Sequence, residues 1–300
     1  MAVYRRTYRA YDGPLTPSGR RFLVIPRYVF ADMRGRRFLT SFFLVSMLYP
    51  LACALLIYIN QNANFFKLLP EGPKAGFLSI NAQFFMTFLG VQSMAAYFLT
   101  AFIGPGLIAP DLANNALPLY LSRPFSRGEY VLGKISVLWI LLSVMTWIPG
   151  LLLFLLQAYL VGWSWASENL RIAGALFAGA WVWIIIMSLL ALALSAWVKW
   201  KPAAGALVLG VFFVAAGFGA AVNGVMRTRW GHLMNMSHLV GSVWVSMFQD
   251  KAHRGDGAAF FRVAAGEEIP LWCCWTALAV LAAFCVYLLD RKVRGAEVVR

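Results

Sequence analysis

The sequence predicts an all-α integral membrane protein with six transmembrane helices. Of its 300 residues, 61% are hydrophobic and only 13% are charged, and the mean hydropathy is +0.70. Soluble domains average about 45–50% apolar and about 25% charged residues, so a soluble core is excluded. A helix needs about 20 apolar residues to cross a bilayer. The segments that meet this need are 38–59, 81–103, 131–158, 171–198, 203–225 and 270–289.

The chain before the first span divides into two parts. Turn signals at Asp12-Gly13-Pro14 and Pro17-Ser18-Gly19 predict an extended arm over residues 1–19. Residues 20–37 have an apolar helical face and an arginine face. The apolar face holds Phe22, Ile25, Val29 and Met33, and the other holds Arg20, Arg27 and Arg34. This pattern predicts an interfacial amphipathic helix, with its arginines among anionic headgroups of membrane lipids. A cytoplasmic extension of span one is the alternative, although Arg34-Gly35-Arg36-Arg37 favours a bend there.

These segments divide the chain into an N-terminal arm with its interfacial helix (1–37), a six-helix transmembrane domain (38–290) and a cytoplasmic tail (291–300). No apolar stretch long enough for a signal peptide occurs in the first 37 residues. We therefore expect span one to act as the insertion signal.

Lys and Arg collect on one side of the predicted bilayer. We place both termini, segment 104–130 and turn 199–202 on that side, which then holds 18 Lys and Arg, counting Lys134, against 8 on the other. Basic loop residues remain in the cytoplasm on insertion, so both termini are expected to be cytoplasmic. The net charge of +14 reflects this topology and attraction to lipid. Nucleic-acid binding would need a basic soluble face with exposed aromatics and is not expected.

The later spans carry signals of close helix packing. Only Lys199 to Pro202 separate spans four and five, so these spans are expected to form a tight helical hairpin. Pro202 suits the first turn of the fifth helix. Small residues recur at four-residue intervals, which favours helix association in lipid, within one chain or between chains. The pairs are Ala175/Gly179, Ala206/Gly210, Ala215/Gly219 and Gly217/Ala221. In the outer loop 226–269, the apolar stretch 238–248 is too short to span, so we expect it to be re-entrant or to lie on the surface.

A search for catalytic and metal-binding patterns finds little. No predicted span has a charged residue near its middle, which argues against ion-coupled transport and against acidic catalytic clusters. The three histidines and four cysteines lack metal-ligand spacing, and the cysteines are expected to be buried thiols. We therefore predict no catalytic, cofactor or metal site in this chain. Polar residues in spans two and three could hydrogen-bond between helices or line a substrate path. For a path we single out Gln83, Thr87, Gln92 and Ser93.

Residues Gly128 to Lys134 match the spacing of a phosphate-binding loop, but Ile135 stands where Mg²⁺ binding needs Ser or Thr. The same residues better predict a helix start, because Ser126-Arg127-Gly128-Glu129 is a capping box before an apolar run. Upstream, Asp111 could cap a short helix reaching about Asn115, or Asn115 could cap one with Pro118 in its first turn. Either way the apolar stub formed by Leu117, Leu119, Tyr120 and Leu121 lies beside Arg123 and Arg127. It could insert into a groove on a partner protein or lie on the membrane.

The segment GLIAPDLANNALPLYLSRPFSRGEYVLGK resembles the loop between spans two and three of ABC-2 type exporter permeases. That loop ends in a Leu-Ser-x-Pro-x-Ser-Arg-x-Glu-Tyr-x-x-Gly-Lys-like run, which Leu121 to Lys134 follow. The resemblance implies a cytoplasmic coupling helix that docks into a separate ABC ATPase, and a permease dimer whose pathway is lined by spans two and five. ATP and Mg²⁺ would bind the ATPase, and the membrane would be a bacterial inner membrane. The coupling residues would be Asp111, Leu117, Leu119, Tyr120, Leu121, Arg123, Arg127 and Glu129.

Three hypotheses follow. The first is the permease subunit of an ATP-driven exporter with an unidentified substrate. The second is a membrane anchor or assembly scaffold that recruits a soluble partner without transport. The third is a membrane-embedded enzyme acting on lipid, which the lack of a catalytic cluster disfavours.

Overall fold

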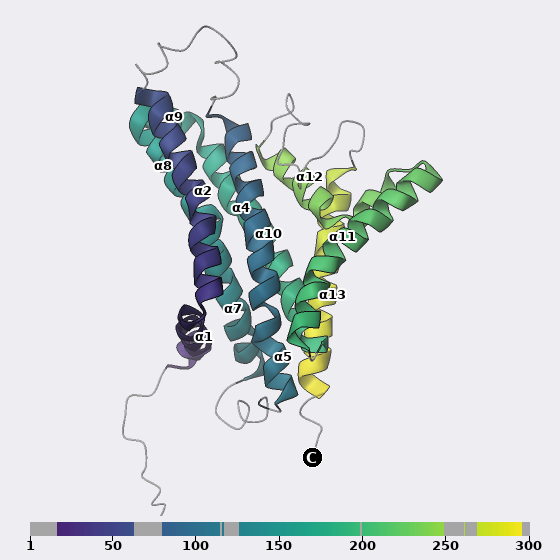
Figure 1. The fold of residues 1–300 in the computed structure, drawn as a ribbon. Helices are drawn as coiled ribbons and strands as arrows, with labels where there is room; N and C mark the ends of the chain where they lie inside the picture. Colours follow the sequence, from purple (N-terminus) through teal and green to yellow (C-terminus); the bar gives the residue numbers. More distant parts are fainter. Residues whose placement is uncertain are drawn as a thin grey trace, which may run out of the picture.

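A computed structural model describes residues 17–62, 80–114, 116, 126–198, 200–248, 261 and 269–295, and every regular element in these ranges is a helix (Figure 1). Its long apolar helices confirm the six predicted spans. They are α2 (Arg37–Asn62), α4 with α5 (Ala82–Ile103 and Pro105–Ala113), α7 with α8 (Arg127–Met145 and Trp147–Val161), α10 (Leu170–Trp197), α11 (Lys201–Met226) and α13 (Leu271–Gly295). Shorter elements are η1 (Ser18–Leu23), α1 (Val24–Gly35), α9 (Trp163–Glu168), η3 (Trp230–Met234) and α12 (Met236–Phe248).

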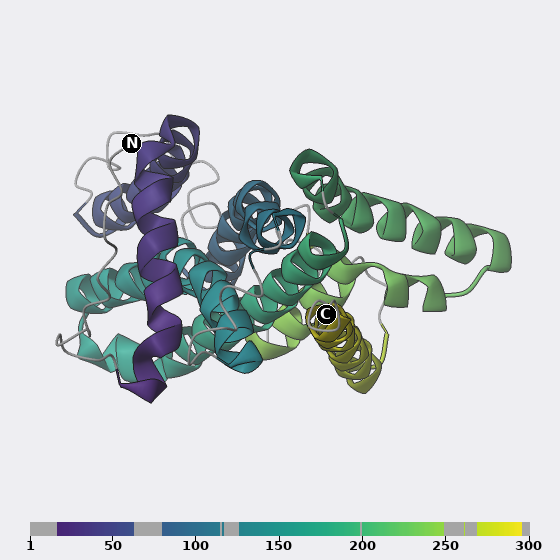
Figure 2. The ribbon, with the colours of Figure 1, turned by 90° about the horizontal axis from the view of Figure 1, so that it is seen from below.

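Helix α10 lies at the centre of the bundle and contacts α4, α5, α7, α8, α11, α12 and α13. In α4–α5, α7–α8 and α10, 61–67% of the residues in the most apolar stretch are buried within the chain, against 17–22% in α2, α11 and α13. The last three helices are therefore peripheral. The C-terminal end of α11 projects away from the rest of the bundle in both views (Figures 1 and 2).

Two of the spans are broken, which the sequence did not predict. Span two turns at Gly104, where a side chain could not fit because a Cβ atom would lie 2.8 Å from that of Ala191 on α10. Pro105 follows and starts α5, since a first-turn proline lacks only a donor that would have no partner in the helix. Span three breaks at Thr146 (φ −105°, ψ −85°), three residues before Pro149. Helix α4 ends at Ile103, the predicted end of span two, and helical structure continues beyond the break in α5 to Ala113.

The apolar stretch of the outer loop forms α12, which packs against α10, α11, α13 and α4 rather than on the surface. The Trp244 indole N–H donates to the Gly179 carbonyl at 2.9 Å. Arg171 Nε donates to the Met247 carbonyl at 3.0 Å, so a side chain from α10 satisfies a carbonyl that is left open at the end of α12. All four cysteines are free and buried, as predicted.

The small-residue pairs divide into packed and open ones. Gly179 contacts Trp244 of α12, and the backbones of Gly219 and Gly231 approach closely between α11 and η3. Gly210 and Gly217 on α11, in contrast, have no atom within 4 Å of an added Cβ. Packing within the chain therefore explains the first two glycines and leaves the other two on an open helix face.

Helix α1 is separate from α2, which confirms the bend predicted at residues 34–37. Arg36 breaks the helix with φ −95° and ψ 93°, and its guanidinium pairs with Asp32 at 2.7 Å. Together η1 and α1 pack against α7. The closest approach is at Gly133, where a Cβ atom would lie 2.6 Å from Ile25 Cδ1 and 2.9 Å from the Phe22 carbonyl oxygen. The amphipathic helix thus rests on the first turns of α7.

Substituting Gly133→Ala should loosen η1 and α1 from α7. Alanine favours a helix over glycine by about 1 kcal/mol, but overpacking at a backbone contact costs about 1–3 kcal/mol, so the net effect should be destabilising. The measurements are the thermal midpoint from tryptophan fluorescence and the rate of tryptic cleavage at Arg20, Arg21 and Arg27. Gly128→Ala is the matched control, because the nearest atom to its added Cβ is 4.0 Å away. Equal cleavage rates in both variants would contradict this packing.

Candidate functional site

The candidate site is the base of the loop that joins α5 to α7. The C-terminal end of α5 and the N-terminal end of α7 lie at the same end of the bundle as α1 and the C-terminal end of α13 (Figure 1). Of the predicted coupling residues, Asp111 lies on α5, and Arg127 and Glu129 lie in the first turn of α7. The rest fall outside the described residues and stay predictions: Leu117, Leu119, Tyr120, Leu121 and Arg123. Asn115, the alternative helix cap, also lies outside them.

The predicted capping box at the start of α7 is confirmed. Ser126 Oγ accepts a hydrogen bond from the Glu129 N–H at 3.2 Å, and Glu129 Oε2 accepts one from the Ser126 N–H at 2.6 Å. These bonds satisfy two donors that a helix N-terminus leaves open. They fix where the loop ends and α7 begins. The sequence that resembles a phosphate-binding loop lies inside the first turns of this helix.

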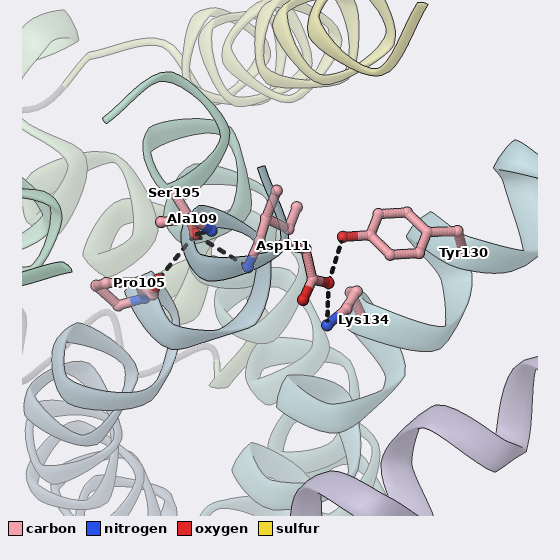
Figure 3. A network of polar contacts seen from close by, with 7 residues as sticks. Pro105, Ala109, Asp111, Tyr130, Lys134 and Ser195 are labelled. Atoms are coloured by element: carbon pink, nitrogen blue, oxygen red, sulfur yellow. Dashed lines mark hydrogen bonds and ion pairs between the residues drawn. The ribbon is translucent and has the colours of Figure 1, made fainter. Parts of the chain in front are cut away.

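Asp111 joins the two ends of the loop base through a buried polar network (Figure 3). Its Oδ2 atom lies 2.7 Å from Lys134 Nζ and accepts a hydrogen bond from the Tyr130 hydroxyl at 2.8 Å. Tyr130 and Lys134 are four residues apart, so they share one face of α7. We call these three residues the Asp111 network. Asp111 itself lies in the last turn of α5, so its predicted role as a helix cap was wrong.

The burial of this ion pair makes it costly to separate. The Lys134 side chain is 7% exposed and that of Asp111 is 17% exposed. A buried pair adds little net stability over apolar side chains, but removing one partner leaves an uncompensated charge and typically costs about 3–5 kcal/mol. The pair therefore holds α5 and α7 in a specific arrangement at the base of the loop.

A second set of bonds joins α5 to α10, and we call it the Ser195 network. Ser195 Oγ accepts hydrogen bonds from the N–H groups of Ile108 at 3.2 Å and Ala109 at 3.0 Å. The same hydroxyl donates to the Pro105 carbonyl at 3.1 Å (Figure 3). Ile108 and Ala109 are the fourth and fifth residues of α5, so the hydroxyl bridges the Pro105 carbonyl and N–H groups about one turn further along the helix.

The residues predicted for a substrate path all lie on α4. Gln92 and Ser93 are 1% and 0% exposed, while Gln83 and Thr87 are partly buried. Within the described part of the chain, Gln92 Nε2 and Ser93 Oγ have no hydrogen-bond partner. The structure therefore does not provide the interhelical bonds that were the alternative for these two side chains. The substrate path stays a prediction.

Sequence reasoning missed Tyr130, Lys134 and Ser195. A usable signal existed for Lys134, because a lysine seven residues inside an apolar helix needs an acidic partner and Asp111 is nearby in the chain. Its four-residue spacing from Tyr130 adds to that signal. Ser195 gave no signal, since a serine in an apolar span is common and its partners are backbone groups.

The Asp111–Lys134 pair should show strong coupling in a double-mutant cycle. Lys134→Met should destabilise the protein by about 3 kcal/mol, at the low end of the range because Asp111 keeps some exposure. Adding Asp111→Asn should restore part of that loss, which thermal unfolding in lipid nanodiscs would measure. The control cycle uses Arg36→Met and Asp32→Asn, an exposed pair expected to couple by less than about 1 kcal/mol. Additive effects at Asp111 and Lys134 would contradict the assigned pair.

Comparison with known families identifies the family of this chain. A family model described as ABC-2 family transporter protein matches residues 31–252, which cover spans one to five and the whole loop base. The comparison with curated proteins found no match. Family membership makes the chain a multi-pass membrane component of transport and implies association with an ABC ATPase subunit. The chain belongs to the ABC-2 family of transporter proteins, as the resemblance of the segment from Gly106 to Lys134 predicted.

Proposed function

We propose that this chain is the permease subunit of an ABC-2 type exporter, driven by a separate ABC ATPase that binds segment 111–127. The observation that carries the proposal is the Asp111 network, which fixes the base of this loop to two spans in a member of the family. The basic residues of the inner loops favour a cytoplasmic position for this segment, where ATP is available.

In this proposal, ATP binding closes the ATPase subunits and displaces the loop. The Asp111–Lys134 pair holds α5 and α7 together, so the displacement reaches both spans instead of bending the loop base. Leu117, Leu119, Tyr120 and Leu121 supply the apolar contact with the ATPase, and Arg123 and Arg127 supply its basic edge. Glu129 fixes the helix start, and Asp111 positions the loop rather than touching the ATPase. ATP and Mg²⁺ bind the ATPase.

A second permease copy would complete the pathway. Helix α11 is the least buried span, and the open face at Gly210 and Gly217 permits a close approach of another helix. We propose that spans two and five line a substrate path near the axis of this dimer, with Gln83, Thr87, Gln92 and Ser93 as its polar residues. Lipid covers the remaining apolar faces, and both termini are cytoplasmic in a bacterial inner membrane.

Alanine substitution of Leu119, Leu121 and Arg127 together should release the ATPase. An affinity-tagged chain is purified from its native membranes, and the bound protein with Walker motifs is quantified by mass spectrometry and by its ATP hydrolysis. We expect at least a tenfold loss of bound ATPase, because the apolar contact and one basic residue are removed. The control variant substitutes Val161, Leu170 and Arg229, which are exposed on the predicted outer side, and should retain the ATPase.

Equal ATPase binding in the two triple variants would reject the coupling role. If the ATPase binds and hydrolyses ATP but no transmembrane distance changes on trapping with vanadate, the scaffold hypothesis is favoured over transport. Loss of binding together with nucleotide-dependent helix movement in the unsubstituted complex supports the exporter.

A further inference from the structure

The break at Gly104 separates α5 from the rest of its own span. Pro105 has no N–H, so the carbonyl of Ala101 lacks the helical donor that an ordinary residue 105 would supply. Gly205 of α11 lies against that carbonyl, with an added Cβ atom only 2.8 Å from its oxygen. The hydrogen-bond ladder that would join α4 to α5 is therefore interrupted, and α5 needs other attachments.

Those attachments lead to α10. Ser195 bonds to three backbone groups of α5, and Gly104 lies directly against Ala191, one turn earlier on α10. Each bond involves a buried hydroxyl surrounded by apolar side chains, where a lost partner costs about 1–3 kcal/mol. The first turn of α5 is thus held by a neighbouring helix, not by the helix that precedes it.

Helix α7 is joined to the same helix. The Trp139 indole N–H donates to Ser188 Oγ at 3.0 Å, and Ser188 lies seven residues before Ser195 on α10. The Asp111 network closes the remaining side between α5 and α7. These bonds connect α5, α7 and α10 pairwise, so the two ends of the loop are attached to one three-helix unit.

We propose that Ser195 is a positioning residue that transmits displacement of the loop from α5 to α10, the central helix, ahead of α4. This inference rests on the proposed function, because it needs an ATPase that displaces the loop. It adds that the fourth span, which the loop does not adjoin in sequence, receives the movement directly. Helix α4 is connected to α5 by the peptide chain at Gly104, whose N–H donates to the Thr100 carbonyl at 2.8 Å, and by side-chain packing, without a bond to Ser195.

Distances between nitroxide labels test directly whether α5 is attached to α10. Labels are placed on Ala113 and Leu170, exposed residues at the end of α5 and the outer end of α10, in the permease–ATPase complex in nanodiscs. Labelled chain is diluted with unlabelled chain, so that the measured distances lie within one chain. The native cysteines are buried, and a sample without introduced cysteines measures any labelling of them. We expect one narrow distance that is the same without nucleotide and after trapping with ATP and vanadate. A shift of this distance on trapping would overturn the proposal.

Ser195→Ala should broaden the Ala113–Leu170 distance even without nucleotide, because α5 loses its bonds to α10. Thr100→Ala is the matched control. It also removes a buried hydroxyl, but that hydroxyl bonds only to the Ala96 carbonyl of its own helix, at 2.7 Å. Thr100→Ala should keep the narrow distance. If the distance distribution in Ser195→Ala equals that of the unsubstituted chain, Ser195 does not attach α5 to α10 and the proposal is overturned.

A second label pair measures transmission, which a purely structural serine would not affect. Labels at Leu48 on α2 and Leu170 on α10 should change distance on vanadate trapping in the unsubstituted complex and lose that change in Ser195→Ala, with the ATPase still bound. A retained change in Ser195→Ala overturns the transmission role alone. If trapping changes no distance in the unsubstituted complex, the proposed function fails first, while the nucleotide-free distances still decide whether Ser195 joins α5 to α10.

Discussion

The Asp111–Lys134 ion pair is the interaction on which the arrangement at the inner end of the bundle depends. Neither charge can be left alone at this depth without a penalty of several kcal/mol, and Tyr130 occupies a further lone pair of the carboxylate. Helices α5 and α7 therefore cannot move apart without exposing one of the charges to water or neutralising it. Apolar packing would allow gradual sliding, whereas a paired charge with a specific hydrogen bond has one favourable geometry. We therefore expect the loop base to move as a unit instead of deforming, in keeping with the discrete rearrangements of packed interfaces.

The same constraint applies to backbone groups, because hydrocarbon offers no water to replace a missing hydrogen bond. Groups of α10 pair with polar groups of the neighbouring helices α5 and α12. Ser195 serves the start of α5, the Gly179 carbonyl accepts from Trp244 of α12, and Arg171 donates to the end of α12. Helix α10 is unbroken from Leu170 to Trp197, so it can provide these partners at several depths. Its central place follows from this role as well as from its apolar surface.

The sequence predicted the features that depend on local pattern and missed those that depend on distant partners. Span positions follow from apolar length, and the capping box at Ser126 and the bend before Arg37 follow from residues within one or two turns. Asp111 was misassigned because an acidic residue after Pro110 has the pattern of a helix start. Pro110 instead lies inside α5, and the carboxylate is held by residues 19 and 23 positions further along the chain. The place of α12 was also open, since an apolar stretch of its length is compatible with burial or with a surface position.

Helix α11 shows how the proposed dimer differs from an interface in water. Its inner half is held by the Tyr97 hydroxyl, which donates to the Leu209 carbonyl at 2.7 Å, and by packing of Phe212 against Trp183. Its outer half projects from the bundle with residues such as Val214 at 71% exposure, which lipid tails can cover without cost. Burying that surface against a second copy therefore gains no hydrophobic free energy, since apolar side chains leave one apolar environment for another. Association along α11 must then depend on close van der Waals fit, and Gly210 and Gly217 are where the absence of side chains allows two helix backbones to approach closely enough for it.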